Sequence, residues 1–395
     1  MRHRIVVLGA GYAGAGTAGS LARYLHRDDV EITVVNANST FVERMRLHEV
    51  AAGHDSRSYD LAAAFAGTGI QLRQALVTTI DADQRTVTVT DSDGAEQLEY
   101  DTLVYALGST ASDGGVPGVF EHALHIAGRE TAVRLRDRLN AMTSGRVLVV
   151  GGNLTAIEGA TEIAESHPDL KVVLVTRSEL GGWLGPKARR HLLRAFDRLG
   201  IELHEHTTIE RVTATGAVAA DGSTFTSDVT VWTAGFAVHP IAGEGGLKVA
   251  DNNQIVVDRM MRSVSHPEVY AVGDSAYAMG DNGKPMPMSC ASAGFTRIQA
   301  VSTIVGDLTG HKITQSALAY YGNTISLGRK DGIFQVVDKN AQSKTWSLRG
   351  RAMATFKEGV VRGAGWAARK PTAGLPTRTY RVTTAPRRST VTTGS

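Results

Sequence analysis

Glycine residues with the spacing G-x-G-x-x-G stand near the start of the chain, at Gly9, Gly11 and Gly14. An apolar strand pattern precedes them, and an alanine-rich helix and a second apolar strand follow within residues 4–35. In such a unit the first glycine makes a tight turn, the second lets the backbone approach a pyrophosphate, and the third lets the helix pack on the strand. The helix N-terminus adds free N–H groups and the positive end of a dipole. These features predict a dinucleotide-binding turn.

A second strand-turn-helix unit follows at residues 146–175, with the turn Gly151-Gly152-Asn153-Leu-Thr-Ala156. Asn153 replaces the second glycine, so its Cβ crowds a pyrophosphate, although asparagine tolerates left-handed backbone angles better than most residues. Ala156 replaces the third glycine, a change that the motif admits. We therefore predict a second dinucleotide site that is altered rather than abolished.

Each unit is followed by hairpin-like strands, over residues 86–100 and 211–226, and then by an apolar strand that ends in Gly108 or Gly235. This internal repeat predicts an α/β fold with two Rossmann-like domains that carry antiparallel β insertions.

A third apolar strand, residues 267–273, ends in Gly273-Asp274. It delivers a carboxylate to the carboxyl end of a strand, which is where α/β proteins bind ligands. A long helix is expected at about residues 289–308.

Basic side chains gather in residues 41–53, which include Arg44, Arg46 and His48. Arg44 and His48 are four apart and are expected to share one helical face. They either contact a cofactor phosphate or substrate, or form an ordinary polar face paired with Glu43 and Glu49; the sequence favours neither reading.

Composition limits the classes of protein that remain. The chain has 395 residues, 42% of them apolar and 21% charged, and no apolar run near the ~20 residues that cross a bilayer. Cys290 is the one cysteine, which excludes an intrachain disulfide, a C-x-x-C redox pair and a thiolate zinc cluster. We expect no metal, a cytoplasmic protein, and redox chemistry carried by a bound cofactor.

Charge is uneven along the chain. Residues 345–395 carry ten Lys and Arg against one acidic residue, Glu358, while the rest of the chain has 32 basic and 38 acidic residues. We favour a solvated tail over a surface that meets anionic lipid or an acidic partner, because no clean amphipathic stripe is evident. The tail lacks interleaved aromatic residues, so no nucleic-acid binding is expected.

Together these motifs resemble the flavoproteins with two dinucleotide-binding domains, and within them the type II NADH dehydrogenase-like branch, from Ile5 to about Lys370. The resemblance implies that the first glycine turn holds the pyrophosphate of FAD and that Asp274 hydrogen-bonds its ribityl chain. It also implies that the helix after residue 289 points its N-terminus at the flavin, and that the second turn holds NAD(P)H. The disulfide-reductase branch is excluded, because residues 39–53 contain no cysteine.

The resemblance also implies boundaries and site residues. We expect an FAD-binding domain at 1–112 and 244–318, an NAD(P)-binding domain at 113–243, a small C-terminal α+β domain at 319–370 and a basic tail at 371–395. The FAD residues expected are Gly9, Gly11, Tyr12, Ala13, Gly14, Asn36, Arg44, Val77, Ala106, Gly108, Gly273, Asp274, Ser289 and Cys290. The NAD(P) residues expected are Gly151, Gly152, Asn153, Ala156, Glu158, Arg177 and Gly235.

Individual positions refine these expectations. Asn36 stands where an acidic residue usually grips the adenosine ribose, and its amide can still bond hydroxyls. Arg177 follows the second strand of the second unit, which favours NADPH over NADH. Arg44, His48 and Cys290 are the candidates for catalysis, and Cys290 also reads as a small buried residue.

The quinone-binding relatives carry two glutamines in a run that corresponds to residues 290–295, where this chain has none. Our leading hypothesis is an FAD-dependent NAD(P)H oxidoreductase that reduces a small organic acceptor. A flavoenzyme of specialised metabolism with a degenerate NAD(P) site is the second hypothesis, and a non-enzymatic flavin-binding or signalling protein is the third. A homodimer is left open.

Overall fold

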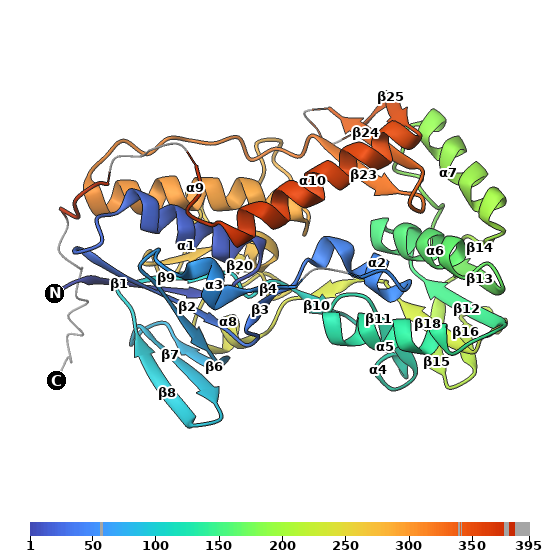
Figure 1. Cartoon of the computed structure of the whole chain (residues 1–395), viewed down its shortest axis with the longest axis horizontal. Helices are drawn as coiled ribbons and strands as arrows, with labels where there is room; N and C mark the ends of the chain where they lie inside the picture. The colour runs from blue at the N-terminus through green and yellow to red at the C-terminus, as the bar shows by residue number, and fades with distance from the viewer. Residues whose placement is uncertain (56–57, 339, 341, 375–378, 384–395) are drawn as a thin grey trace.

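The first sheet contains five parallel strands in the order β21-β9-β1-β2-β5 in the computed structural model, which describes residues 1–55, 58–338, 340, 342–374 and 379–383 (Figure 1). Its strands are β1 (His3–Leu8), β2 (Val30–Asn36), β5 (Ile70–Gln74), β9 (Thr102–Tyr105) and β21 (Val269–Ala271). The inner strands β1 and β9 are nearly continuous apolar runs because parallel strands are covered on both faces, whereas the edge strand β5 alternates apolar and polar residues. Helices α1 (Tyr12–Tyr24) and α9 (Cys290–Thr309) pack side by side over one face.

A second parallel sheet has the order β11-β18-β12-β13-β14. Its strands are β11 (Ala123–His125), β12 (Gly145–Val150), β13 (Leu170–Val175), β14 (Glu202–His204) and β18 (Val229–Trp232), and its helices are α5 (Arg129–Asn140), α6 (Leu154–Ser166) and α7 (Pro186–Leu199). In each sheet the first strand of the repeat, β1 or β12, has the next strands of the chain on one side and later strands on the other. At such a reversal the carboxyl edge of a parallel sheet has a crevice for a ligand.

Each parallel sheet has a three-stranded antiparallel insertion. The insertions are β6 (Leu76–Asp81), β7 (Thr86–Asp91) and β8 (Gly94–Glu99), and β15 (Ile209–Thr213), β16 (Gly216–Ala219) and β17 (Thr224–Thr226). The predicted fold class is thereby confirmed. The domain boundaries remain a prediction.

Short elements connect these layers. They are β3 (Thr40–Phe41), the 3-10 helix η1 (Arg44–Arg46), α2 (Leu47–Ala51), β4 (Tyr59–Asp60), α3 (Leu61–Phe65), β10 (Thr110–Ala111), α4 (Val119–His122), β19 (Phe236–Ala237), α8 (Ile241–Glu244), β20 (Ile255–Val256), η2 (Gly273–Ser275) and β22 (Ala276–Tyr277).

The C-terminal part forms the small α+β unit that we expected, so residues 345–369 are not the solvated tail that we favoured for residues 345–395. Strands β23 (Gly322–Ser326), β24 (Gly332–Val337) and β25 (Ser343–Arg349) form a sheet, and α10 (Arg351–Arg369) runs from it back to α1 (Figure 1). Helix α10 buries Val361 and Gly365 and exposes Phe356 and Trp366. Helix α10 is amphipathic, so the expectation that this segment has no clean amphipathic stripe is wrong.

Part of the expected basic tail is also docked. The backbone N–H of Tyr380 donates to Tyr24 O at 2.6 Å, and that of Thr383 donates to Leu308 O at 2.9 Å. Residues 375–378 and 384–395 of that tail lie outside the described residues. No helix in the described part of the chain is long and apolar enough to cross a membrane.

Helix α2 joins the two halves of the molecule. It follows β2 and β3 of the first half in sequence, yet it packs against α5 and α6 of the second half. Leu47, Val50, Ala51 and Ala52 are buried in the hydrophobic core around the second sheet. A piece of chain from the first repeat therefore completes the core of the other repeat.

A buried carboxyl group lies beside this contact. Glu162 of α6 is fully buried, and its Oε1 lies 3.1 Å from Nε2 of His54. Burial raises the pKa of Glu162 to about 8, although Arg329 opposes the shift. The folded protein therefore holds a proton on Glu162 that the unfolded chain releases above its ordinary pKa.

This proton makes stability depend on pH. Because the folded-state pKa is the higher one, wild-type stability should fall as pH rises from about 4.5 to about 8. Replacing Glu162 by Gln should leave stability at pH 5 nearly unchanged and raise it at pH 8.5, by on the order of 4 kcal/mol. Thermal unfolding across this range measures the difference, and parallel curves for the two proteins would contradict the assignment.

Candidate functional site

The first glycine turn has the shape that a bound pyrophosphate needs. Gly9 has a φ of +93°, and a Cβ there would clash with the carbonyl of Ala106. A Cβ on Gly14 would clash with the carbonyl of Gly9, whereas a Cβ on Gly11 would meet nothing within 4 Å. Helix α1 has no side-chain cap at its N-terminus. The turn thus leaves an open cradle at a helix dipole, and these residues fit the FAD pyrophosphate.

The neighbours of this turn hold its conformation. Asn36, at the end of β2, accepts the Ala10 N–H through Oδ1 at 2.9 Å and donates Nδ2–H to Asn38 O at 2.7 Å. The Gly108 N–H donates to Ser275 Oγ at 2.9 Å. Val77 is buried in β6, and Ala13 is buried in the first turn of α1. Asn36 thus supports the glycine turn directly.

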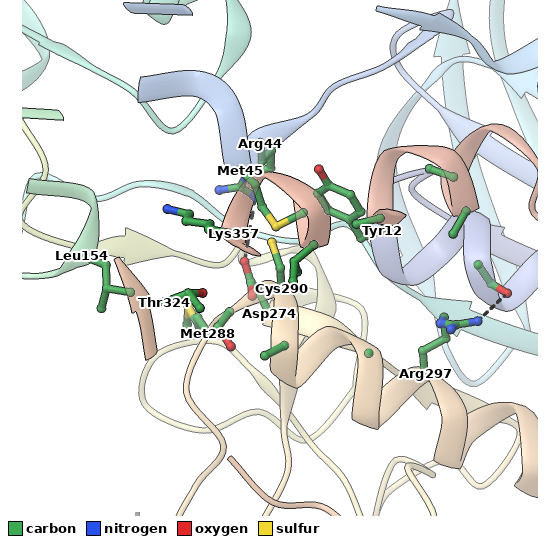
Figure 2. A pocket seen from close by; sticks show the side chains of 18 of the residues that line it. Tyr12, Arg44, Met45, Leu154, Asp274, Met288, Cys290, Arg297, Thr324 and Lys357 are labelled. Atoms are coloured by element: carbon green, nitrogen blue, oxygen red, sulfur yellow. Dashed lines mark hydrogen bonds and ion pairs between the residues drawn. The ribbon is translucent and has the colours of Figure 1, made fainter. Parts of the chain in front are cut away.

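Asp274 lies just after the end of β21, as expected from its strand pattern. Gly273 takes a φ of +70°, and its N–H donates to Thr296 Oγ1 at 3.0 Å, which ties the turn to α9. Ser109 Oγ donates to Asp274 Oδ2 at 2.6 Å, and Arg44 Nη1 lies 3.9 Å from the same oxygen (Figure 2). The carboxylate is therefore held in place with its remaining acceptor positions available.

Helix α9 begins beside this carboxylate. Ser289 caps the helix, and its Oγ accepts the Ser292 N–H at 3.1 Å. Cys290 lines the pocket next to Asp274 and Tyr12 (Figure 2). Cys290 is exposed, so the alternative reading of it as a small buried residue is wrong. Desolvation by the surrounding pocket walls, with Asp274 nearby, raises the pKa of the Cys290 thiol to about 11. The thiol stays protonated at neutral pH, so it lacks the thiolate character of a nucleophilic cysteine.

Arg44 and His48 do not share one helical face, because Arg44 lies in η1 and His48 in the following helix α2. Both nevertheless line the pocket. The alternative, a solvated face paired with Glu43 and Glu49, is also wrong for these two residues. The adjacent Arg46 makes those ion pairs, at 3.5 and 3.0 Å.

The pocket has a volume of about 830 Å³ and lies between the two halves. The expected site residues that line it are Tyr12, Arg44, His48, Asp274, Ser289 and Cys290 from the flavin side, together with Glu158 of α6 and Asn153, which precedes that helix. The other expected residues, Gly9, Gly11, Ala13, Gly14, Asn36, Val77, Ala106, Gly108, Gly151, Gly152, Ala156, Arg177, Gly235 and Gly273, lie outside its lining.

A buried ion pair crosses this pocket. Lys357 of α10 pairs with Glu158 of α6, whose Oε1 also accepts the Ser326 N–H at 3.0 Å. Burial alone would raise the pKa of Glu158, but the ammonium of Lys357 holds that pKa below its ordinary value. His48 Nδ1 lies 4.0 Å from Glu158, and burial lowers the pKa of His48. No local pattern pointed to Lys357, because it stands 199 residues from its partner.

The second glycine turn is capped from within the chain. A Cβ on Gly151 would clash with Thr233, and one on Gly152 would clash with Thr176. Asn153 Oδ1 accepts the Ala156 N–H at 3.2 Å, and Nδ2–H donates to Thr233 O at 3.1 Å. Asn153 has a φ of −89°, so the left-handed backbone that we considered for it is wrong. Its amide occupies the helix N-terminus where a pyrophosphate would bind.

This cap should weaken nucleotide binding. Replacing Asn153 by Gly frees the Ala156 N–H and removes the Cβ, so the KM for the preferred nicotinamide nucleotide should fall by about fivefold to tenfold. Steady-state kinetics with each nucleotide measure the change. The matched variant Asn252→Gly, in a loop of the first half, should leave KM unchanged. An unchanged or higher KM for Asn153→Gly would show that the amide does not compete with the pyrophosphate.

Two further expected residues lie at the edge of the second sheet. Arg177 is exposed directly after β13 and Thr176, and it forms no ion pair with a described residue. Gly235 has a φ of +148°, and its carbonyl accepts the Ser112 N–H at 3.3 Å. In the described residues, no group of three His, Cys, Asp or Glu side chains could hold a metal ion.

A family described as pyridine nucleotide-disulphide oxidoreductase matches residues 3–294, well over half of the chain. The chain belongs to this family. It is therefore an FAD-dependent NAD(P)H oxidoreductase, and the hypothesis of a non-enzymatic flavin protein is set aside.

Curated relatives of this oxidoreductase cover most of its length. It is 26% identical to the demethylphylloquinone reductase NdbB of Synechocystis, over 83% of this chain and 85% of the relative. It is 28% identical to the NADH dehydrogenase-like protein Rv1812c of Mycobacterium tuberculosis, over 87% and 91% of the two chains. It is 25% identical to the type II NADH:quinone oxidoreductase of Staphylococcus aureus, over 93% and 98%.

Solved structures share the fold of this oxidoreductase. NDH2 of Plasmodium falciparum, solved with NADH, superimposes with a TM-score of 0.77 at 14% identity, over 94% of this chain and 97% of that one. The sulfide:quinone oxidoreductase of Aquifex aeolicus has a TM-score of 0.76 at 19% identity, over 94% and 93%.

Proposed function

We propose that this oxidoreductase takes a hydride from NAD(P)H onto FAD and passes two electrons to a small, quinone-like organic acceptor. One observation carries the proposal. The 830 Å³ pocket brings Tyr12, Asp274 and Cys290, next to the first glycine turn, together with Asn153 and Glu158 of the second. A flavin and a nicotinamide held by these two turns would meet in that pocket, where hydride transfer requires close contact.

The residues of the first half fit FAD. The turn from Gly9 to Gly14 would hold the pyrophosphate, and Asp274 would accept hydrogen bonds from the ribityl hydroxyls. The N-terminus of α9 would place positive dipole charge near the ring, which stabilises developing negative charge. FAD supplies the electron-carrying ring when bound, and the residues of this chain supply binding, orientation and electrostatics.

The residues of the second half would position NAD(P)H. The turn at Gly151–Ala156 would approach the pyrophosphate, and Gly235 would leave room near the nicotinamide. Lys357 keeps Glu158 ionised, which fixes a negative charge at the nicotinamide side of the pocket. A carboxylate at that position would orient the carboxamide or the ring of the nicotinamide. The first half-reaction, hydride transfer from NAD(P)H to FAD, requires no proton transfer.

The names of the relatives support a quinone-like acceptor, since two of them reduce quinones. The two glutamines that quinone-binding relatives carry are missing from residues 290–295 of this chain. Their absence suits an acceptor that differs from the quinones of those relatives. Cys290 and Gly294 line the pocket at that part of α9, and neither supplies an amide donor for a quinone carbonyl.

An anaerobic experiment tests the proposal. The purified yellow protein is mixed with NADPH or NADH, and the flavin absorbance is followed before and after addition of naphthoquinone. We expect bleaching by one nucleotide, and recovery of the yellow colour when the quinone is added. Protein that keeps its FAD but does not bleach with either nucleotide would favour the second hypothesis, a flavoenzyme with a degenerate NAD(P) site. The internal cap of Asn153 is the observation that supports that alternative.

We also propose that NADPH is preferred over NADH. Arg177 follows the second strand of the NAD(P)-binding repeat and is free of described acidic partners, so its guanidinium can pair with a 2′-phosphate. Arg177→Ser should raise the KM for NADPH by about tenfold or more and leave that for NADH within twofold. Arg190→Ser, an exposed arginine of α7, is the matched control. Equal effects on both nucleotides would contradict the preference.

We also propose that the protein is cytoplasmic and contacts the membrane surface through its basic C-terminal region. Helix α10 and β25 expose Trp346, Phe356 and Trp366 among basic residues, a combination that suits an anionic membrane surface. Co-sedimentation with anionic vesicles, and its loss at high salt, measures this contact.

A further inference from the structure

The chain crosses between its two parallel sheets twice, and the two crossings pair with each other. The first crossing contains β10, which lies between the two halves in Figure 1, and the return crossing contains β19. These two strands pair antiparallel, and we call them the crossing ribbon. The Ser112 N–H donates to Gly235 O at 3.3 Å, and Trp232 Nε1–H donates to Ser112 O at 2.7 Å. Both covalent connections between the two sheets therefore run through one short, hydrogen-bonded ribbon.

Arg44 contacts both crossings with one guanidinium group. Its Nη1 donates to Ser109 O at 2.8 Å, and its Nη2 donates to Ser109 Oγ at 3.3 Å. Ser109 directly precedes β10. The Cζ of Arg44 lies 5.8 Å from the centre of the Phe236 ring, and Phe236 is the first residue of β19. The guanidinium thus holds the first crossing through hydrogen bonds and the return crossing through an aromatic face.

The same guanidinium group is part of the environment of Asp274. Ser109 Oγ donates to Asp274 Oδ2 at 2.6 Å, and Arg44 Nη1 lies 3.9 Å from that oxygen (Figure 2). Because a hydroxyl group has a single hydrogen, Ser109 gives it to Asp274 and accepts from Arg44. A continuous series of contacts therefore leads from Asp274 to the return crossing, and Arg44 is its central member.

Two simpler roles for Arg44 explain these contacts less well. A residue that only neutralises Asp274 would need a positive charge, which lysine also supplies, and would need no planar group over Phe236. A residue that only stabilises the crossing ribbon would need no position beside Asp274. A rigid, planar group that touches both places is suited to couple them, because the position of one contact restricts the other.

We propose that Arg44 is a positioning residue, which couples the binding of FAD at Asp274 to the angle between the two sheets. The ribityl hydroxyls would fix the carboxylate, the fixed carboxylate orients Ser109 and Arg44, and Arg44 holds the return crossing. This inference rests on the proposed function, because hydride transfer needs the reacting atoms of nicotinamide and flavin to lie about 3–3.5 Å apart. A small rotation about the crossing ribbon would change that distance. Arg44 should therefore affect the rate of hydride transfer more than the affinity for the nucleotide.

Flavin reduction in a single turnover tests the proposal. Arg44→Lys keeps a positive charge near Asp274 and removes the planar group over Phe236. We expect its limiting rate of flavin bleaching to fall by about tenfold to a hundredfold, with the Kd for the nucleotide within about threefold of wild type. Phe236→Leu should have a similar effect, and the double variant should be no slower than the slower single variant, because both changes break one contact. Arg211→Lys, at an exposed arginine of β15, is the matched control and should leave the rate unchanged.

Hydrogen exchange measures the coupling without any turnover. In wild type, saturating FAD should slow amide exchange in residues 108–113 and 233–238 by at least about tenfold relative to FAD-free protein, because the ribbon becomes more rigid. Arg44→Lys and Phe236→Leu should each lose this slowing while they retain FAD. Residues 209–226, the antiparallel insertion of the second half, form the control segment and should exchange equally with and without FAD.

The outcomes separate this inference from the proposed function. Slowing that depends on Arg44 supports the coupling even if neither nucleotide bleaches the flavin, a result that would overturn only the electron-transfer function. Equal slowing in wild type and both variants overturns the coupling, and so does a ribbon whose exchange FAD leaves unchanged. Loss of FAD from Arg44→Lys alone would make Arg44 a direct cofactor ligand and would also overturn the positioning role. If Arg44→Lys does not fold, Phe236→Leu decides between these outcomes by the same two measurements.

Discussion

Protein with Asp274 replaced by Ala is expected to purify without its yellow colour and to lose NAD(P)H oxidation by at least about a hundredfold. The carboxylate lies just past the end of β21, held by Ser109 at 2.6 Å and by Arg44 at 3.9 Å. Hydrogen bonds to a charged acceptor contribute about 1.5–3 kcal/mol each, so losing two would lower FAD affinity by more than two orders of magnitude. Flavin content per protein after gel filtration measures the loss.

Two variants make this result interpretable. Asp251→Ala removes an exposed carboxylate from the same half of the molecule and should retain FAD fully. Asp274→Asn keeps the acceptor oxygen without the charge and should bind FAD with intermediate affinity. If Asp274→Ala retains FAD as tightly as wild type, the position assigned to the flavin is wrong, even if the protein folds normally.

The second large effect concerns the ion pair between Glu158 and Lys357. Replacing Lys357 by Met leaves the carboxylate of Glu158 without its cation in a pocket where both side chains are nearly buried. Removing one partner of such a pair typically costs about 3–5 kcal/mol, because the remaining charge stays desolvated. The free energy of unfolding of Lys357→Met should fall by about that amount at pH 7.5, and activity should fall with it.

The pH dependence and a double variant identify the cause. In wild type the pKa of Glu158 is held low, so its contribution to stability is present above its ordinary pKa and is lost as pH falls. In Lys357→Met the largest opposing group is gone, so burial raises the pKa of Glu158 against the remaining hydrogen bond from Ser326. The difference in stability from wild type should therefore narrow toward pH 5. Adding Glu158→Gln to Lys357→Met should recover more than half of the lost stability. A double variant that is less stable than the single one would exclude this explanation.

The repeated motifs predicted most of the fold. The turns at Gly9 and Gly151 each carry a local signature, since a strand, a glycine turn and a helix lie within about thirty residues. Asp274 could be placed for the same reason, because its strand ends directly before it. Helix α1 begins at Tyr12, within the glycine motif itself.

The rest of the site depends on contacts between distant residues, which no local pattern encodes. Lys357 and Arg297 reach the pocket from helices whose positions follow from tertiary packing. Asn153 was recognised as a departure from the glycine motif. The helix cap formed by its side chain could not be predicted, because it depends on the side-chain rotamer and on Thr233, which is 80 residues away. Arg44 and His48 both line the pocket. The prediction that they share one helix was wrong, because Arg44 lies in η1 and His48 in α2.

The packing of α2 limits how the enzyme can be divided. Leu47, Val50, Ala51 and Ala52 belong by sequence to the first repeat, yet they are buried around the second sheet. A fragment that contains the second repeat alone would expose that apolar surface and aggregate when expressed. An engineer who grafts this nucleotide-binding module onto another flavoprotein would have to transplant residues 44–53 together with it.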